Sequence, residues 1–203
     1  MNIPIITIGR QYGSGGREIA KLLASRLDIP LYDKEILTEA AKSSGFSEQT
    51  FEMFDESKES MLYYALTTGS MYGMELPLPV QLCLEQFRAI GEVAQKGSCI
   101  IVGRCANFVL RDQPNVLSIF IHAPKVKRID RICRLQNMTD AEAEKQIRIT
   151  DKRRAAYYQH YTDWKWGDAE GYDLSINSAK TGIGGAVNLI EQYIVLTQEA
   201  SGK

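Results

Sequence analysis

Residues 3–27, IPIITIGRQYGSGGREIAKLLASRL, place a glycine-rich turn between a short apolar run and a helical pattern. The run over 3–8 is β-branched and apolar almost throughout, which predicts a strand that is covered on both faces. After the turn, Ile19, Leu22, Leu23 and Leu27 recur at helical spacing. A strand that passes through such a turn directly into a helix is an arrangement that can bind phosphate groups.

Short apolar runs and helical patterns alternate along the rest of the chain. Strands are predicted at 3–8, 30–32, 98–102, 116–121 and 172–176, with helical patterns at 19–27, 36–45, 47–66, 81–95, 105–110, 125–136, 139–158 and 185–198. This alternation predicts an α/β fold in which helices cover both faces of a five-stranded parallel sheet. Ligands of such sheets bind where the strands end at their carboxyl termini. Those ends are Gly9, Asp33, Gly103 with Arg104, His122 and Asn177.

Two shorter segments add detail to this pattern. The stretch TTGSMYGMELPLPV, residues 67–80, is rich in Gly, Met and Pro and is predicted to be a loop. The stretch TDAE, residues 139–142, is a capping box, in which the Thr139 hydroxyl and the Glu142 carboxylate satisfy the end amides of a helix. It predicts that a long helix begins here.

The composition describes an ordinary globular chain. It has 203 residues, of which 44% are hydrophobic and 24% charged, so one substantial core is expected. A net charge of -1 gives no reason to expect binding to nucleic acid or to a membrane surface. Between Arg104 and Arg154, however, 12 Lys and Arg stand against 6 Asp and Glu. This basic region can attract a small polyanionic ligand, and a solvated helical face is the alternative interpretation.

Cysteine usage and hydropathy concern the compartment. Cys83, Cys99, Cys105 and Cys133 form no C-x-x-C pair, which argues against a metal site or a disulfide framework and suits a reducing compartment. No apolar run approaches the roughly 20 residues that span a bilayer, and no basic-then-apolar leader opens the sequence. We therefore expect a cytoplasmic protein that is a monomer or a homodimer.

The glycine-rich turn carries the chemistry of a phosphate site. Gly13, Gly15 and Gly16 allow a close backbone approach, so that amides at a helix N-terminus can face an anion. Arg10 and Arg17 add full positive charges on either side of the turn.

One ligand class for this turn is a dinucleotide. That motif, G-x-G-x-x-G, requires an acidic residue about 20 positions later. Gly13 and Gly15 supply two glycines, and Asp33 lies at a suitable distance. Glu18 occupies the third glycine position, where a carboxylate would repel a pyrophosphate, so this class is disfavoured.

The other ligand class is a nucleoside triphosphate in a phosphate loop, G-x-x-x-x-G-K-[ST]. Gly16 takes the second glycine position, Arg17 the lysine position and Glu18 the hydroxyl position. The first glycine position falls on Gln11, so the turn alone does not decide between the classes.

The second half of the chain supplies further anion-binding groups. Arg104 follows a strand directly, where its planar guanidinium can bind phosphate oxygens bidentately. Asp151 and Arg154 are three residues apart and so share a helical face. Taken singly, the alternatives are a surface arginine and an intrahelical salt bridge.

The order of these features resembles the nucleoside monophosphate kinases, and most closely the cytidylate kinase-like family. The matching segments are the glycine-rich RQYGSGGREIA, YDKEIL at the second strand, IVGR after the third, DKRR in the later basic helix and YDLSIN at the last strand. The resemblance covers most of the chain and is weakest over 45–97. It implies a three-layer α/β/α fold of the P-loop NTPase type, with a helical acceptor-binding insertion at 34–97 and a lid at 137–168, all within one domain over 1–203.

The resemblance also implies the reaction and the residues that perform it. The implied reaction is phosphoryl transfer from ATP with Mg²⁺ to a nucleoside monophosphate, with CMP or dCMP as the expected acceptor. The expected ATP- and phosphate-binding residues are Arg10, Tyr12, Gly13, Ser14, Gly15, Gly16, Arg17, Glu18 and Asn177. The expected acceptor-binding residues are Asp33, Arg104, Asp151 and Arg154, and the expected catalytic arginines are Arg17, Arg128, Arg131 and Arg154. Glu18 and Asp33 are the candidate metal ligands.

Three positions depart from the pattern of the cytidylate kinases. Arg17 replaces the loop lysine, Cys105 replaces an aspartate, and Ile147 replaces an arginine. Arg17 keeps the charge but spreads it over a fork, which is not a conservative change. Two alternatives therefore remain open, a nucleotide-binding regulatory module without transferase activity and a kinase of a non-nucleotide small molecule.

Overall fold

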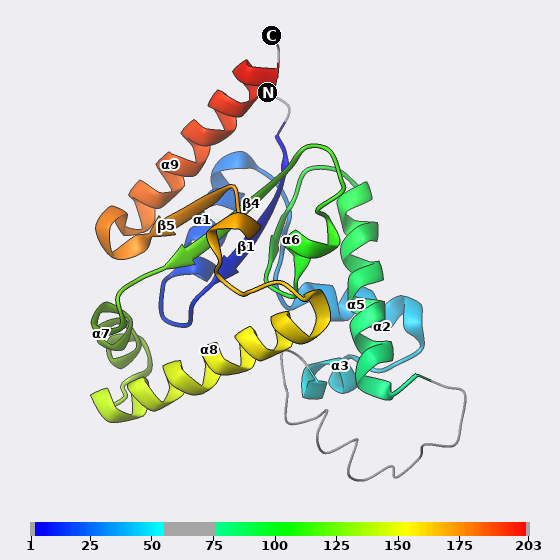
Figure 1. Cartoon of the computed structure of the whole chain (residues 1–203), viewed down its shortest axis with the longest axis horizontal. Coiled ribbons are helices and arrows are strands. Elements are labelled where there is room, and N and C mark those ends of the chain that lie inside the picture. Colours follow the sequence, from blue (N-terminus) through cyan, green and yellow to red (C-terminus); the bar gives the residue numbers. More distant parts are fainter. Residues whose placement is uncertain (1–2, 55–75, 202–203) are drawn as a thin grey trace.

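The computed structural model describes residues 3–54 and 76–201. Within these residues, five parallel strands form one sheet in the order β2-β3-β1-β4-β5 (Figure 1). The strands are β1 (Ile5–Arg10), β2 (Leu31–Tyr32), β3 (Ile100–Val102), β4 (Val116–His122) and β5 (Leu174–Asn177).

β1 is the central strand and the point at which the sheet reverses its winding. Ile6 pairs with Ile100 of β3 on one side and with Leu117 of β4 on the other. The chain passes from β1 outward to β2, returns to β3, and then crosses β1 to reach β4. The carboxyl ends of strands at such a reversal leave a crevice in which ligands bind. The glycine-rich turn follows Arg10 and therefore lies at this crevice.

Helices cover both faces of the sheet and give three layers (Figure 1). α1 (Gly16–Leu27) and α9 (Ser178–Ser201) pack on one face, and α2 (Glu35–Ser44), α5 (Leu78–Gln95) and α6 (Ala106–Val109) pack on the other. α3 (Glu48–Phe54) lies beside α2 and α5. α7 (Lys125–Gln136) and α8 (Asp140–Thr162) pack together, and α8 lies across the end toward which the strands point (Figure 1). A 3₁₀ turn, Ala169–Gly171, precedes β5.

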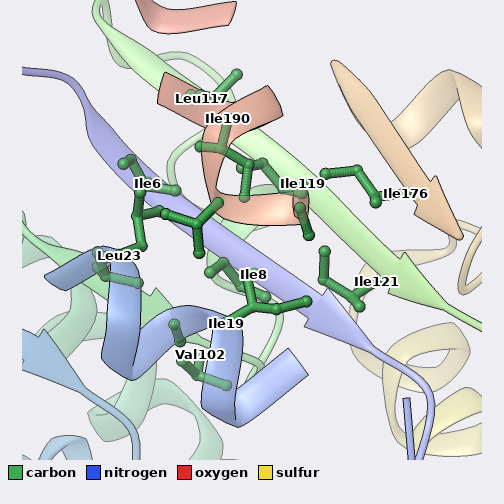
Figure 2. Packing of buried hydrophobic residues seen from close by; sticks show 14 of the residues in the cluster. Ile6, Ile8, Ile19, Leu23, Val102, Leu117, Ile119, Ile121, Ile176 and Ile190 are labelled. Carbon is green, nitrogen blue, oxygen red and sulfur yellow. The ribbon is translucent and has the colours of Figure 1, made fainter. Parts of the chain in front are cut away.

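The core explains why the strands are apolar on both faces. On the side of α1 and α9, Ile8 of β1, Ile119 of β4 and Ile190 of α9 pack in one cluster (Figure 2). On the opposite side, Ile101 of β3 packs with Ile36 and residues of α5. A strand between two such layers buries side chains on both of its faces, which explains why these strands are mostly apolar.

The predicted fold is confirmed, with five parallel strands at the predicted places and helices in two outer layers. The capping box is confirmed as well: the Thr139 hydroxyl accepts a hydrogen bond from the Glu142 amide at 3.4 Å. In return, the Thr139 amide donates to the Glu142 carboxylate at 2.9 Å. Within the described ranges, no helix is both long enough and apolar enough to cross a membrane.

Several predicted boundaries differ from the structure: β1 spans Ile5–Arg10 rather than 3–8, α1 begins at Gly16 rather than at 19, and the bounds of three further helices differ as well. α5 begins at Leu78, inside the predicted loop over 67–80, because Pro79 lies in the first helical turn, where a missing N–H breaks no hydrogen bond. α8 continues to Thr162 rather than ending near 158. α9 begins at Ser178 rather than at 185, since Gly182 (φ 67°) divides it into two helical parts. The predictions for 55–66 and 67–75 lie outside the described residues.

Replacing Ile8 by alanine tests the central position of β1. Ile8 is completely buried between the two layers, so Ile8→Ala should lower the free energy of unfolding by about 2–5 kcal/mol. Urea unfolding followed by circular dichroism measures this change. The matched control is Ile149→Ala on α8, where the side chain is 40% exposed and the expected loss is below about 1 kcal/mol. Equal losses in the two variants would contradict the proposed central position.

Candidate functional site

The glycine-rich turn over 11–15 joins β1 to α1 and takes a conformation that only some residues adopt easily. Gly13 and Gly15 have φ angles of 79° and 81°, in the left-handed region. Gly15 is the N-cap of α1, and a Cβ on it would lie 2.7 Å from Cδ1 of Ile183. The turn therefore presents its backbone closely to whatever lies at the N-terminus of α1, where amides and the helix dipole attract anions.

Asp33, at the end of β2, gathers three arginines from different elements. Its Oδ2 lies 2.5 Å from Nε of Arg17, and its Oδ1 lies 3.6 Å from Nη1 of Arg104 and 3.9 Å from Nη2 of Arg10. The backbone oxygen of Asp33 also accepts a hydrogen bond from the Arg104 guanidinium. Asp33, Arg10 and Arg104 are buried, whereas Arg17 is exposed. The structure thus places one carboxylate and three guanidiniums at the carboxyl ends of neighbouring strands.

A second ion pair ties the turn to α7 and α8. Asp151 Oδ1 accepts a hydrogen bond from the backbone amide of Tyr12 at 2.8 Å, and its Oδ2 lies 2.5 Å from Nη1 of Arg128. Arg128 also donates to the backbone oxygens of Tyr12 and Ala123, each at 3.1 Å. Arg128 is buried, and its N–H groups donate both to the Asp151 carboxylate and to the backbone of the turn. In this arrangement Asp151 and Arg128 hold the turn in shape.

Arg154 and the Tyr12 side chain extend this connection. Arg154 donates to the backbone oxygen of Arg10 at 3.3 Å, and its guanidinium lies 5.9 Å from the centre of the Tyr12 ring. The Tyr12 hydroxyl accepts hydrogen bonds from Gln136 at 2.8 Å and Gln146 at 3.0 Å. The turn is therefore held by both α7 and α8.

Arg131 and Glu18 form another ion pair, at the opposite side of the turn. Glu18 lies in the first turn of α1, and Arg131 reaches it from α7. A Cβ on Gly15 would lie 3.3 Å from Cζ of Arg131. The guanidinium thus lies against the N-cap of α1, within the predicted phosphate loop.

A small cavity of about 20 Å³ lies beneath the arginines, between the ends of β1 and β3 and the helix α8. Arg10, Arg104 and Arg154 line it together with Tyr158 and Tyr172, among other residues. Burial raises the pKa of both tyrosine hydroxyls, so they are neutral donors and acceptors at ordinary pH. The space has room for about one water molecule.

Two further positions singled out in the sequence are Cys105 and Asn177. Cys105 is buried and packs in a cluster with Cys83, Tyr157 and Tyr158, so it is a packing residue. The side chain of Asn177 accepts a hydrogen bond from the amide of Ala179 at 3.1 Å, which places it at the start of α9.

The structure brings Arg10, Arg17, Arg104 and Arg154 together. The acidic residues Asp151 and Glu18, however, pair with arginines of α7, which the sequence did not indicate. Arg10, Arg17 and Arg104 meet at Asp33, and Arg154 joins Arg10 and Arg104 around the cavity. Asp151 faces the turn and Arg128, and Glu18 faces Arg131. Their predicted roles toward an acceptor and a metal stay predictions.

Sequence reasoning missed the residues that hold the turn from its sides. The Ser178 hydroxyl donates to the backbone oxygen of Ser14 at 2.6 Å and so joins α9 to the turn. The Gln11 side chain accepts from the amide of Ala123 at 3.2 Å, and Gln146 reaches Tyr12. The sequence offered one signal for these contacts, the position of Ser178 directly after the end of β5. The carboxyl ends of parallel strands converge, so a polar residue at that place can reach the turn after β1.

The chain is similar to known proteins along most of its length. The model of the cytidylate kinase-like family matches residues 5–180. The chain belongs to this family. Its relatives include the cytidylate kinase of Methanococcus aeolicus, which is 26% identical over 195 residues, covering 94% of this chain and 97% of the relative. The cytidylate kinase of Methanocaldococcus jannaschii is 25% identical over 194 residues, with the same coverage of both chains.

Two solved structures are similar to this chain. A crystal structure of an uncharacterized protein from Eubacterium ventriosum is 32% identical and has a TM-score of 0.72, covering 94% of this chain and 98% of that one. The shikimate kinase of Acinetobacter baumannii is 14% identical with a TM-score of 0.52, covering 96% of this chain and 94% of that one. The second likeness concerns the fold alone.

Replacing Asp151 by asparagine tests whether its carboxylate holds the turn. The variant keeps the size of the side chain but leaves the buried Arg128 without its anionic partner. The free energy of unfolding should fall by about 1–3 kcal/mol, measured by urea unfolding. Asp112→Asn is the matched control, because the Asp112 side chain is 83% exposed beside Arg111 and its loss should change stability by less than about 0.5 kcal/mol. An Asp151 variant as stable as the wild type would refute this role.

Proposed function

We propose that the chain transfers the γ-phosphoryl group of ATP to a nucleoside monophosphate, with CMP or dCMP as the acceptor. The observation that carries the proposal is the meeting of the glycine-rich turn with Arg10, Arg17 and Arg104 at the strand ends beside β1. One side of this site suits the phosphates of a donor and the other suits the phosphate of an acceptor. Membership of the cytidylate kinase-like family supports the same reaction class.

The donor's phosphates would lie in the turn formed by residues 13–17. The amides at the N-terminus of α1 point toward this position, and the left-handed glycines keep side chains away from it. Asp151 and Arg128 keep the turn in shape before the nucleotide arrives, so little ordering is needed on binding. Asn177, at the end of β5, is expected to contact the donor nucleotide.

The acceptor's phosphate would lie near Arg104, with Asp33 and Arg154 close by. Arg104 is held by the backbone oxygen of Asp33, which fixes the orientation of its planar guanidinium. A guanidinium held in this way can bind two phosphate oxygens in one geometry. Arg10 and Arg154 border the same cavity and add charge there.

The transfer itself asks mainly for alignment and charge neutralisation. An oxygen of the acceptor's phosphate forms a bond to the γ-phosphorus, while the bond from that phosphorus to the β–γ bridging oxygen breaks. ADP leaves with this oxygen and its electron pair. The arginines stabilise the charge on the transferred group, and α8 covers the strand ends, which helps to exclude water as a competing acceptor.

Magnesium is expected to enter with ATP. In the described ranges no group of three or more His, Cys, Asp or Glu is arranged to hold a metal, but kinases hold Mg²⁺ with one or two carboxylates and the substrate's phosphates. Of the two candidates Asp33 is the better one, because no hydrogen bond from the described residues reaches its buried Oδ1. Arg104 and Arg10 lie 3.6 Å and 3.9 Å from that oxygen, so a bound ion would share the carboxylate with these arginines. When bound, the ion would neutralise charge on the phosphates. Glu18 fits less well, since Arg131 occupies its carboxylate.

A kinase acting on a non-nucleotide acceptor is the second candidate. Ile147 stands where the cytidylate kinases have an arginine, and it is buried against Ile132 and Ala143. This position offers no charge to an acceptor, which weakens the case for cytosine selectivity. The relatives named cytidylate kinase favour CMP.

The test is ADP formation from ATP and Mg²⁺ with a panel of nucleoside monophosphates and small hydroxyl-bearing acids. Turnover that depends on CMP or dCMP supports the proposal, and turnover with a hydroxyl acid alone supports the second candidate. ATP binding without turnover on any acceptor would instead indicate a nucleotide-binding module.

Arg104→Ala should lower acceptor-dependent turnover by about 100-fold or more, because a fixed charge on the reacting phosphates is lost. Arg111→Ala is the matched control, since Arg111 is exposed and stacks on Phe108 outside the site. Circular dichroism verifies that both variants fold. A folded Arg104 variant with wild-type turnover would rule out this acceptor site.

A further inference from the structure

Arg17 occupies the lysine position of the phosphate loop, but its side chain is directed to the other side of the site. Its Nε lies 2.5 Å from Oδ2 of Asp33, the residue that also meets Arg104 and Arg10. A lysine would place a compact ammonium on the donor's phosphates. In this chain the charge at that position belongs to the cluster at the end of β2, where the acceptor is expected.

Arg131 supplies a positive charge where Arg17 does not. It extends from α7 to the N-cap of α1, so that its Cζ would lie 3.3 Å, and its Nη2 3.5 Å, from a Cβ on Gly15. Its side chain is 22% exposed, which leaves it accessible to a ligand in the turn. A phosphate bound at the N-terminus of α1 would therefore meet this guanidinium.

A guanidinium at this place needs a partner. The N-terminus of a helix carries a partial positive charge, so a cation beside it is unfavourable. Glu18, in the first turn of the same helix, supplies a negative charge that favours both the helix end and the cation. The ion pair between Glu18 and Arg131 thus holds the arginine against the turn before any anion is bound.

We propose that Glu18 is a positioning residue that holds Arg131 over the phosphate loop, and that Arg131 provides the donor-side charge while Arg17 serves the acceptor side. The proposal rests on the proposed function in one respect, since it takes the ligand of the loop to be the triphosphate of ATP. It gives Glu18 a role through Arg131 and not through a metal ion. It also explains how the loop can lack both the lysine and the hydroxyl residue. Arg17 takes the lysine position without serving the donor, and Glu18 takes the hydroxyl position and holds Arg131, which supplies the missing charge.

The test measures ATP binding by calorimetry in the absence of any acceptor, and then the Michaelis constants for ATP and for the acceptor. Arg131→Ala should weaken ATP binding about tenfold or more, and Glu18→Gln about fivefold. In the double variant the loss should equal that of Arg131→Ala alone, because Glu18 acts only through the arginine. Glu18→Asp, which keeps the charge, should restore part of the affinity.

Arg17→Ala should behave differently from these variants. It should leave the dissociation constant of ATP within about twofold, a change near the error of the method, and raise the Michaelis constant for the acceptor. If Glu18 had only a structural role, Glu18→Gln would lower the stability of the protein and would affect ATP and the acceptor alike. Arg134→Ala, one turn further along α7, and Asp28→Asn, at the far end of α1, are exposed charge controls that should bind ATP as the wild type does.

Three results would overturn the proposal. The first is an ATP affinity that falls more in Arg17→Ala than in Arg131→Ala. The second is additive losses in the double variant. The third is a Glu18→Gln variant that needs more Mg²⁺ even when Arg131 is already alanine, since that would make Glu18 a metal ligand. Binding of ATP without transfer to any acceptor would instead refute the proposed function and leave the assignment of Glu18 and Arg131 intact, and a wild-type chain that binds no ATP would refute both.

Discussion

The interaction between Asp33 and the arginines around it is the contact on which the site depends. Arg10 ends β1, Arg17 lies in the first turn of α1 and Arg104 lies just after β3. These elements are neighbours because β1 and β3 pair in parallel register. Cationic side chains do not gather without an anion between them, since like charges at such distances repel strongly. The Asp33 carboxylate therefore holds the three arginine side chains in fixed orientations, just as the sheet holds the backbone.

Much of this architecture follows from local patterns in the sequence. The strands could be predicted because the residues of 3–8 and 116–121 are apolar on both faces, which few other structures require. The glycines of the turn and the capping box at Thr139 could be predicted as well, because each depends only on the backbone conformation of a few consecutive residues. The positions of Arg104 and Asp33 followed from the rule that ligands bind at strand ends.

The choice of ion-pair partners could not be predicted in the same way. Sequence places Asp151 and Glu18 near the site, but which arginine each of them meets depends on the angle of α7 and α8 against the sheet. The expectation paired Asp151 with an acceptor, whereas the structure pairs it with Tyr12 and Arg128. Similarly, the loop over 67–80 was extended too far, since a proline in a first helical turn looks like a helix breaker when only the sequence is read.

Tyr12 is fastened to α8 at two separate points. Its amide is bound by Asp151 and its hydroxyl by Gln146, and these two residues lie on the same helix. A displacement of α8 away from the sheet would have to break both contacts or carry Tyr12 along. The helix that covers the crevice and the turn proposed to bind the nucleotide are therefore mechanically coupled. A movement of α8 that released a bound product would also distort the turn that had bound it.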